Sequence, residues 1–99
     1  MSVREFRWNS EKNEALRQER GVSFEEIELA IEKGNLLDIV KHPNHKRYSH
    51  QKMLVVRLRD YVYLIPYVEE RHCIFLKTII PSRKAVEFYI GKESDNEKE

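Results

Sequence analysis

The pattern of polar and apolar positions over the first twenty residues predicts a short strand and then a weakly amphipathic helix. Charged and aromatic side chains alternate over residues 5–8, which is the period of a strand. Asn9 or Ser10 can then cap a helix that runs to about residue 20. Gly21 supplies the left-handed residue at which such a helix ends.

A second helix is predicted by side chains with specific roles at its start. Ser23 and Glu26 have the spacing of a capping box, and Val22 and Ile27 occupy the two positions of a hydrophobic staple. Apolar residues then recur at helical spacing until Gly34 ends the run. The pattern therefore predicts a helix of about ten residues with one face toward the core.

The rest of the chain predicts mostly strands. An apolar run over residues 36–40 reads as a strand, and the polar, histidine-containing stretch 42–51 reads as a loop. Three further strands are expected to form an antiparallel meander, over residues 52–59, 61–68 and 73–80. Pro81 and Ser82 open a short C-terminal helix that Gly91 closes. The expected class is α+β: a short strand and two helices on a three- to four-stranded antiparallel sheet, with a short C-terminal helix.

The alternation within the meander predicts one aliphatic sheet face and one polar face. The aliphatic face is expected to pack against the helices and to hold Leu54, Val56, Leu58, Val62, Leu64, Val68, Ile74, Leu76 and Ile80. The opposite face is expected to hold Val55, Arg57, Arg59, Tyr61, Tyr63, Ile65, Tyr67, Phe75, Lys77 and Ile79. Its arginine, lysine and tyrosine side chains make this second face the candidate working surface.

Composition limits the domain organisation and the compartment. The 99 residues, 40% of them hydrophobic, suffice for one core, which we place in residues 1–91. Residues 92–99 contain no apolar side chain and predict a disordered acidic tail. The single cysteine, Cys73, allows no internal disulfide, and the first eight residues contain no apolar leader or membrane segment. A cytoplasmic protein is therefore expected.

Charge is distributed unevenly along the chain. Residues 1–40 carry 6 basic and 9 acidic side chains, whereas residues 41–91 carry 10 basic and 4 acidic ones. The overall charge of +1 thus hides a basic second half. Segregation of this kind points to a polyanionic partner, although a solvated basic face would give the same pattern.

Three segments resemble one protein family. Residues 6–13, Phe-Arg-Trp-Asn-Ser-Glu-Lys-Asn, followed by Gly-Val-Ser-Phe-Glu-Glu at 21–26, are similar to the opening of BrnT-like toxins of the RelE superfamily. Residues 79–85, Ile-Ile-Pro-Ser-Arg-Lys-Ala, resemble the isoleucine pair and helix start of that family, and Arg47 and Tyr48 stand where it tends to place an arginine and an aromatic. The resemblance spans roughly residues 6–89.

The resemblance implies a RelE-like fold and the toxin component of a type II toxin–antitoxin system. It implies an endoribonuclease that acts on messenger RNA without a metal or other cofactor. It also implies a cognate antitoxin, usually a small DNA-binding protein, and oligomers of the toxin with itself or with that antitoxin. An acidic antitoxin segment would suit the basic half of the chain.

Metal-independent RNA cleavage needs a base for the ribose 2′-hydroxyl, an acid for the leaving oxygen and cations for the phosphorane charge. Arginine suits the last role because its planar fork holds two phosphate oxygens. The catalytic candidates are Arg57 and Lys77, from the polar sheet face, and Arg83, from the family motif. The candidate RNA-binding residues are Lys12, Arg47, Arg59, Tyr63, Tyr67 and Lys84.

Two other functions remain open. Arg20 and Thr78 stand where the family commonly has a histidine and an arginine, which favours a non-catalytic interaction module with the same fold. A general nucleic-acid-binding domain would instead bind RNA or DNA in a salt-dependent way and leave the strand intact. The four histidines are irregularly spaced and no carboxylate cluster accompanies them, so no metal site is predicted.

Overall fold

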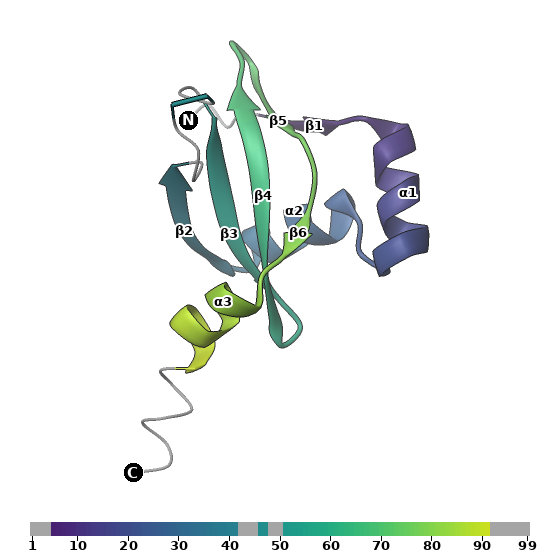
Figure 1. Ribbon diagram of the computed structural model, residues 1–99. Helices are drawn as coiled ribbons and strands as arrows, with labels where there is room; N and C mark the ends of the chain where they lie inside the picture. The colour runs from purple at the N-terminus through teal and green to yellow at the C-terminus, as the bar shows by residue number, and fades with distance from the viewer. Residues whose placement is uncertain (1–4, 42–45, 48–50, 92–99) are drawn as a thin grey trace.

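A mixed sheet with helices on both faces forms the part of the chain that the structure, a computed structural model, describes: residues 5–41, 46–47 and 51–91 (Figure 1). The strands are β1 (Glu5–Trp8), β2 (Leu36–Lys41), β3 (Lys52–Leu58), β4 (Tyr61–Glu69), β5 (Cys73–Leu76) and β6 (Ile80–Pro81). Their order is β1-β5-β4-β3-β2, with β6 paired to β4. Among the strand pairs of this described part, β1 and β5 run parallel and the others antiparallel.

The α+β class is confirmed, although the sheet has more strands than predicted. Both β1 and β2 join the meander, one at each edge, and β6 adds a short pairing to β4. Most of the predicted loop at 42–51 and all of the predicted tail at 92–99 lie outside the described residues.

The first two helices begin and end where the sequence predicts. Helix α1 (Ser10–Arg20) is capped by the Asn9 side chain, which accepts from a first-turn N–H, and it ends at Gly21 with φ of 67°. Helix α2 (Phe24–Glu32) has the full capping box, because Ser23 and Glu26 each accept the backbone N–H of the other.

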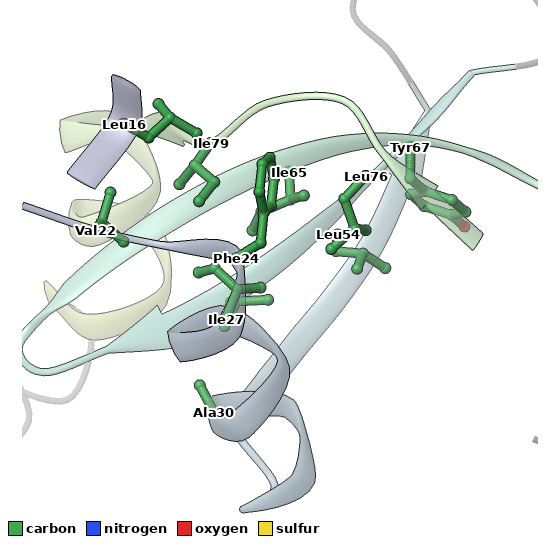
Figure 2. Packing of buried hydrophobic residues seen from close by; sticks show 11 residues of the cluster. Leu16, Val22, Phe24, Ile27, Ala30, Leu54, Ile65, Tyr67, Leu76 and Ile79 are labelled. Atoms are coloured by element: carbon green, nitrogen blue, oxygen red, sulfur yellow. The ribbon is translucent and has the colours of Figure 1, made fainter. Parts of the chain in front are cut away.

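The main core lies between these helices and one face of the sheet (Figure 2). Phe24 and Ile27 of α2 are fully buried there, against Leu76 and Ile65 of the sheet. Trp8 stacks on Phe24 with the ring centroids 5.5 Å apart, so β1 is tied to the start of α2.

The prediction of the two sheet faces is wrong for β4. Leu54 pairs with Ile65 and Leu58 with Tyr61, so even positions of β3 share a face with odd positions of β4. The cause is the two-residue connection between the strands, which places residue 58 opposite residue 61. Ile65 and Tyr67 therefore face α1 and α2, whereas Val62 faces the opposite side of the sheet.

The predicted third strand, residues 73–80, breaks after Leu76. The Lys77 N–H donates to the carbonyl oxygen of Pro66 at 2.8 Å, but a proline has no N–H to return to Lys77, so the ladder stops there. Pairing resumes between Ile80 and Leu64, with one extra residue on the β5–β6 side. The extra residue reverses the predicted faces, so Ile79 is buried in the main core and Ile80 is exposed.

The second sheet face, which the sequence predicts as the polar working surface, is covered in part by the C-terminal helix, so that prediction is wrong for the covered part. Helix α3 (Arg83–Ala85) continues into the π-helical turn η1 (Val86–Ile90). Ala85 packs with Val55 and Val62 in a small second core, which Tyr89 and other residues of η1 border. The part of this face beneath the C-terminal helix is therefore apolar.

Candidate nucleic-acid interface

Two of the candidate arginines lie at the same end of the sheet. Arg57 of β3 pairs with Val62 of β4, and the N–H of Ser82 donates to the carbonyl oxygen of Val62 at 3.1 Å. Arg57, Val62 and Ser82 thus form one row across the sheet, with Arg57 and Ser82 roughly 10 Å apart across two strand spacings. Arg83 follows Ser82 directly, so it lies at the same end of the sheet as Arg57.

Arg57 is held near this end by a weak ion pair. Its guanidinium lies 3.7 Å from the carboxylate of Asp60, with its side chain 34% exposed and that of Asp60 99% exposed. A pair this exposed contributes little to stability and is easily exchanged for another anion. Arg57 can therefore turn from Asp60 to a phosphate at small cost.

Arg83 and Lys84 are exposed at the start of α3. The turn that presents them is fixed by Ser82, whose hydroxyl oxygen accepts from the N–H of Ala85 at 3.1 Å. Ala85 is buried behind them, so the short helix sits on the sheet while its two cations point to solvent.

Lys77 lies at a different level of the sheet. It pairs with Pro66, whereas Arg57 and Ser82 align with Val62, four residue steps or roughly 13 Å away along β4. The Lys77 ammonium lies 5.6 Å from the centroid of the Phe75 ring, a cation–π contact. The register therefore places Arg57 and Arg83 at the same end of the sheet and Lys77 apart from them.

Arg59 points to the opposite side of the molecule. It occupies the turn between β3 and β4 with φ of 58°, and its guanidinium donates to the carboxylate of Glu26 on α2. The prediction placed Arg59 in a strand whose side chains alternate between the two sheet faces. The left-handed backbone at this turn breaks that alternation. The pair instead ties the β3–β4 turn to the helical side.

The two candidate tyrosines also face the helices. Tyr67 is only 5% exposed and belongs to the main core, and Tyr63 packs against that core while its ring lies 5.6 Å from that of Tyr61. Tyr67 cannot stack on a base without unfolding. The prediction that these rings lie on the cationic face is wrong because it assumed the wrong parity for β4.

The remaining candidates lie on other surfaces. Lys12 is exposed in the first turn of α1, and Arg47 is exposed in a two-residue described segment, where it makes an interaction of its own. Among the described residues, the only histidine is His72, in the turn after β4. That turn lies at the far end of β4 from Val62, well away from the arginine pair.

Sequence reasoning missed an exposed aromatic residue in the C-terminal helical segment. Phe88 of η1 is 57% exposed and contacts the edge of Tyr89, with ring centroids 4.8 Å apart. It borders a hollow of about 620 Å³ whose apolar wall also includes Leu64 and Ala85. Helical spacing offered no signal, because residues 85, 88 and 89 stand at i, i+3 and i+4, which share one face of an α-helix.

Tyr89 fixes η1 to the edge strand β2. Its hydroxyl donates to one oxygen of the Asp38 carboxylate at 2.8 Å, and the other oxygen accepts the N–H of Ile39 at 2.8 Å. Burial raises the pKa of Tyr89 and the bond to Asp38 raises it further. Asp38 thus joins the C-terminal helix to β2, which positions Phe88 relative to the sheet.

Acidic side chains lie instead on the side of the sheet that α1 and α2 cover. Burial raises the pKa of Glu28 on α2, and the neighbouring charges of Glu32, Glu25 and Glu5 raise it as well. The basic end at Arg57 and Arg83 and this acidic helix lie on opposite sides of the sheet. A polyanion would accordingly be drawn to the α3 side.

Three further findings bear on the class of protein. Within the described ranges, no three histidine, cysteine or acidic side chains gather as a metal site, and no helix is long and apolar enough to cross a bilayer. Comparison with protein-family models, curated proteins and solved structures finds no match to this chain. Fold and site together define an α+β domain with a basic end flanked by an apolar hollow.

Proposed function

We propose that this chain is the toxin of a toxin–antitoxin pair, a BrnT-like member of the RelE superfamily, and that it cleaves single-stranded messenger RNA. The observation that carries the proposal is the row that joins Arg57 to Ser82 and brings Arg83 to the same end of the sheet. The resemblance of residues 79–85 to the family motif supports it, because Arg83 belongs to that motif.

In this proposal the two arginines hold the scissile phosphate. The ribose 2′-oxygen loses its proton to water as it attacks the adjacent phosphorus, and the bond from phosphorus to the 5′-oxygen breaks as that oxygen takes a proton from water. The products are a 2′,3′-cyclic phosphate and a 5′-hydroxyl. The phosphorane carries more negative charge than the substrate phosphate does. Arg57 and Arg83 therefore stabilise the phosphorane more than they stabilise the substrate.

Expression in a bacterial host tests this activity. Wild-type chain is expected to arrest growth with decay of messenger RNA, and Arg83→Ala or Arg57→Ala to lower the cleavage rate about 100-fold, as removal of a transition-state donor does. Arg83→Lys keeps the positive charge but cannot hold two phosphate oxygens at once, so its activity should lie between those of wild type and Arg83→Ala. Arg17→Ala removes an exposed arginine on α1 and is the matched control. Harmless expression of folded wild-type chain contradicts the proposal.

A non-catalytic module with the same partner is the second candidate. It is favoured by the position of His72, because the one described histidine lies at the wrong end of β4 to act as base or acid at the arginine pair. This candidate predicts a stable complex with an antitoxin, and RNA that stays intact at every concentration of the purified chain. Co-expression with the neighbouring reading frame, followed by an RNA-integrity assay, separates the two.

A further inference from the structure

The hollow beside Arg83 combines an apolar wall with polar groups at its rim. Leu64, Ala85, Phe88 and Tyr89 supply the apolar surface, and Ser82, Lys84 and Glu87 border it. Its volume of about 620 Å³ falls within the range of sites that hold small organic groups.

Phe88 is held in this exposed position by its neighbours in the chain. Ala85, Val86, Tyr89 and Ile90 pack toward the second core, and the Tyr89–Asp38 hydrogen bond anchors the turn to β2. Residues 87 and 88 must therefore face outward. A π-helical turn such as η1 is uncommon and is found often at functional sites.

The charges around the hollow favour a phosphodiester chain over a protein. Among the described residues that line the hollow, Lys84 is the one cation and Glu87 the one acid. Outside the lining, Arg83 precedes Lys84, and Arg57 shares the row of Ser82. Cations that follow a backbone beside an exposed aromatic ring are the arrangement that binds single-stranded nucleic acid, whose unpaired bases stack on the ring. A protein partner would have to supply acids for these cations as well as an apolar group.

We propose that Phe88 is the stacking platform for one unpaired RNA base, which enters this hollow while Arg83 and Lys84 contact the neighbouring phosphates. The proposal rests on the proposed function and deepens it, because it places a nucleotide next to the scissile phosphate. It also assigns to Phe88 the role that the sequence pattern had given to Tyr63 and Tyr67.

Binding of a fluorescein-labelled 2′-O-methyl RNA 10-mer of mixed sequence, measured by anisotropy, tests this site without interference from cleavage, since no 2′-hydroxyl is available to attack. Phe88→Ala is expected to raise Kd about 10-fold, the usual effect of losing one stacking ring. Phe88→Tyr keeps a ring and should bind within about twofold of wild type. Leu29→Ala removes a side chain on α2 that is 49% exposed and is the matched control.

A duplex of the same 2′-O-methyl sequence provides the second arm. Its bases are stacked within the helix, so Phe88→Ala should leave duplex affinity unchanged. Equal losses for single strand and duplex, or no loss for either, overturn the proposal. So does a change from dimer to monomer in Phe88→Ala on size-exclusion chromatography with RNA affinity unchanged, because the ring would then serve a protein interface.

The nuclease proposal and the stacking-site proposal can be refuted independently of each other. Phe88-dependent binding by a wild-type chain that leaves unmodified RNA intact supports the stacking site and overturns the nuclease. Cleavage by wild type and Phe88→Ala with the same KM overturns the stacking site alone. Absence of any RNA binding by folded wild-type chain overturns both.

Discussion

Asn13 joins the two helices through a buried side chain, and its replacement provides a direct test of the packing described here. Its side-chain oxygen accepts the N–H of Phe24 at 2.8 Å, and its amide nitrogen donates to the carboxylate of Glu25 at 2.8 Å. Phe24 opens α2, so its N–H has no partner within that helix. Asn13 of α1 thus satisfies a buried donor at the start of α2.

The cost of Asn13→Ala follows from that donor. A buried N–H without a partner costs about 1–3 kcal/mol, and the bond to the exposed Glu25 adds only a fraction of that because solvent screens it. We expect the free energy of unfolding to fall by about 2 kcal/mol, which lowers Tm by roughly 10 °C for a domain of this size. Gln18→Ala, which removes an exposed hydrogen bond on the same helix, should change stability by less than about 0.5 kcal/mol.

The pH dependence of this difference follows from Glu25. The hydrogen bond from Asn13 lowers the pKa of Glu25 below its ordinary value of 4.5. The stabilisation from this bond is therefore complete above pH 4.5 and is lost as the pH falls through the lower pKa of the folded state. Urea unfolding of wild type and Asn13→Ala at several pH values measures both effects. A difference below about 0.5 kcal/mol at pH 7 would refute the assignment.

Three further predictions concern single side chains. Ser23→Ala removes the side-chain cap of α2 and should lower the free energy of unfolding by about 1 kcal/mol in urea titration. Tyr89→Phe removes the hydrogen bond to Asp38 and should cost about 1 kcal/mol. Because the pKa of Tyr89 is raised, that stabilisation is present below about pH 10 and is lost as the pH rises further; a difference that persists at high pH would contradict it. Cys73 is buried, and its hydrogen bond to Glu70 raises the pKa of its thiol. Iodoacetamide should therefore modify Cys73 far more slowly in native than in urea-unfolded protein, which mass spectrometry can measure. Equal rates of modification would contradict this.

The local elements were predictable because short-range chemistry fixes them. Asn9, Gly21 and the Ser23–Glu26 capping box specify helix ends through contacts within a few residues, and the structure has each of them. The parity error in β4 was avoidable, since a two-residue turn already places Leu58 opposite Tyr61.

Long-range pairings could not be read from the local pattern. β1 joins the sheet parallel to β5, with Trp8 beside Leu76, and nothing near residue 8 encodes that contact. The extra residue between β5 and β6 follows from Pro66 on the neighbouring strand, so it depends on knowing which strand lies opposite.

The residues of the candidate site could likewise be predicted from the sequence only in part. Arg83 and Lys84 could be named from a motif within the sequence. Their association with Arg57 needed the β3–β4 and β4–β6 registers, and the separation of Lys77 needed the break at Pro66. Phe88 emerged only once the C-terminal helix had a defined inner face.

Cleavage of an unmodified single-stranded RNA by the purified chain, with the ends of the products identified by mass spectrometry, tests the central claim most directly. The account predicts fragments that end in a 2′,3′-cyclic phosphate, a rate about 100-fold lower for Arg57→Ala and for Arg83→Ala, and a near wild-type rate for Lys77→Ala. Intact RNA after incubation with folded wild-type protein, or a loss in Lys77→Ala as large as in Arg83→Ala, would contradict it.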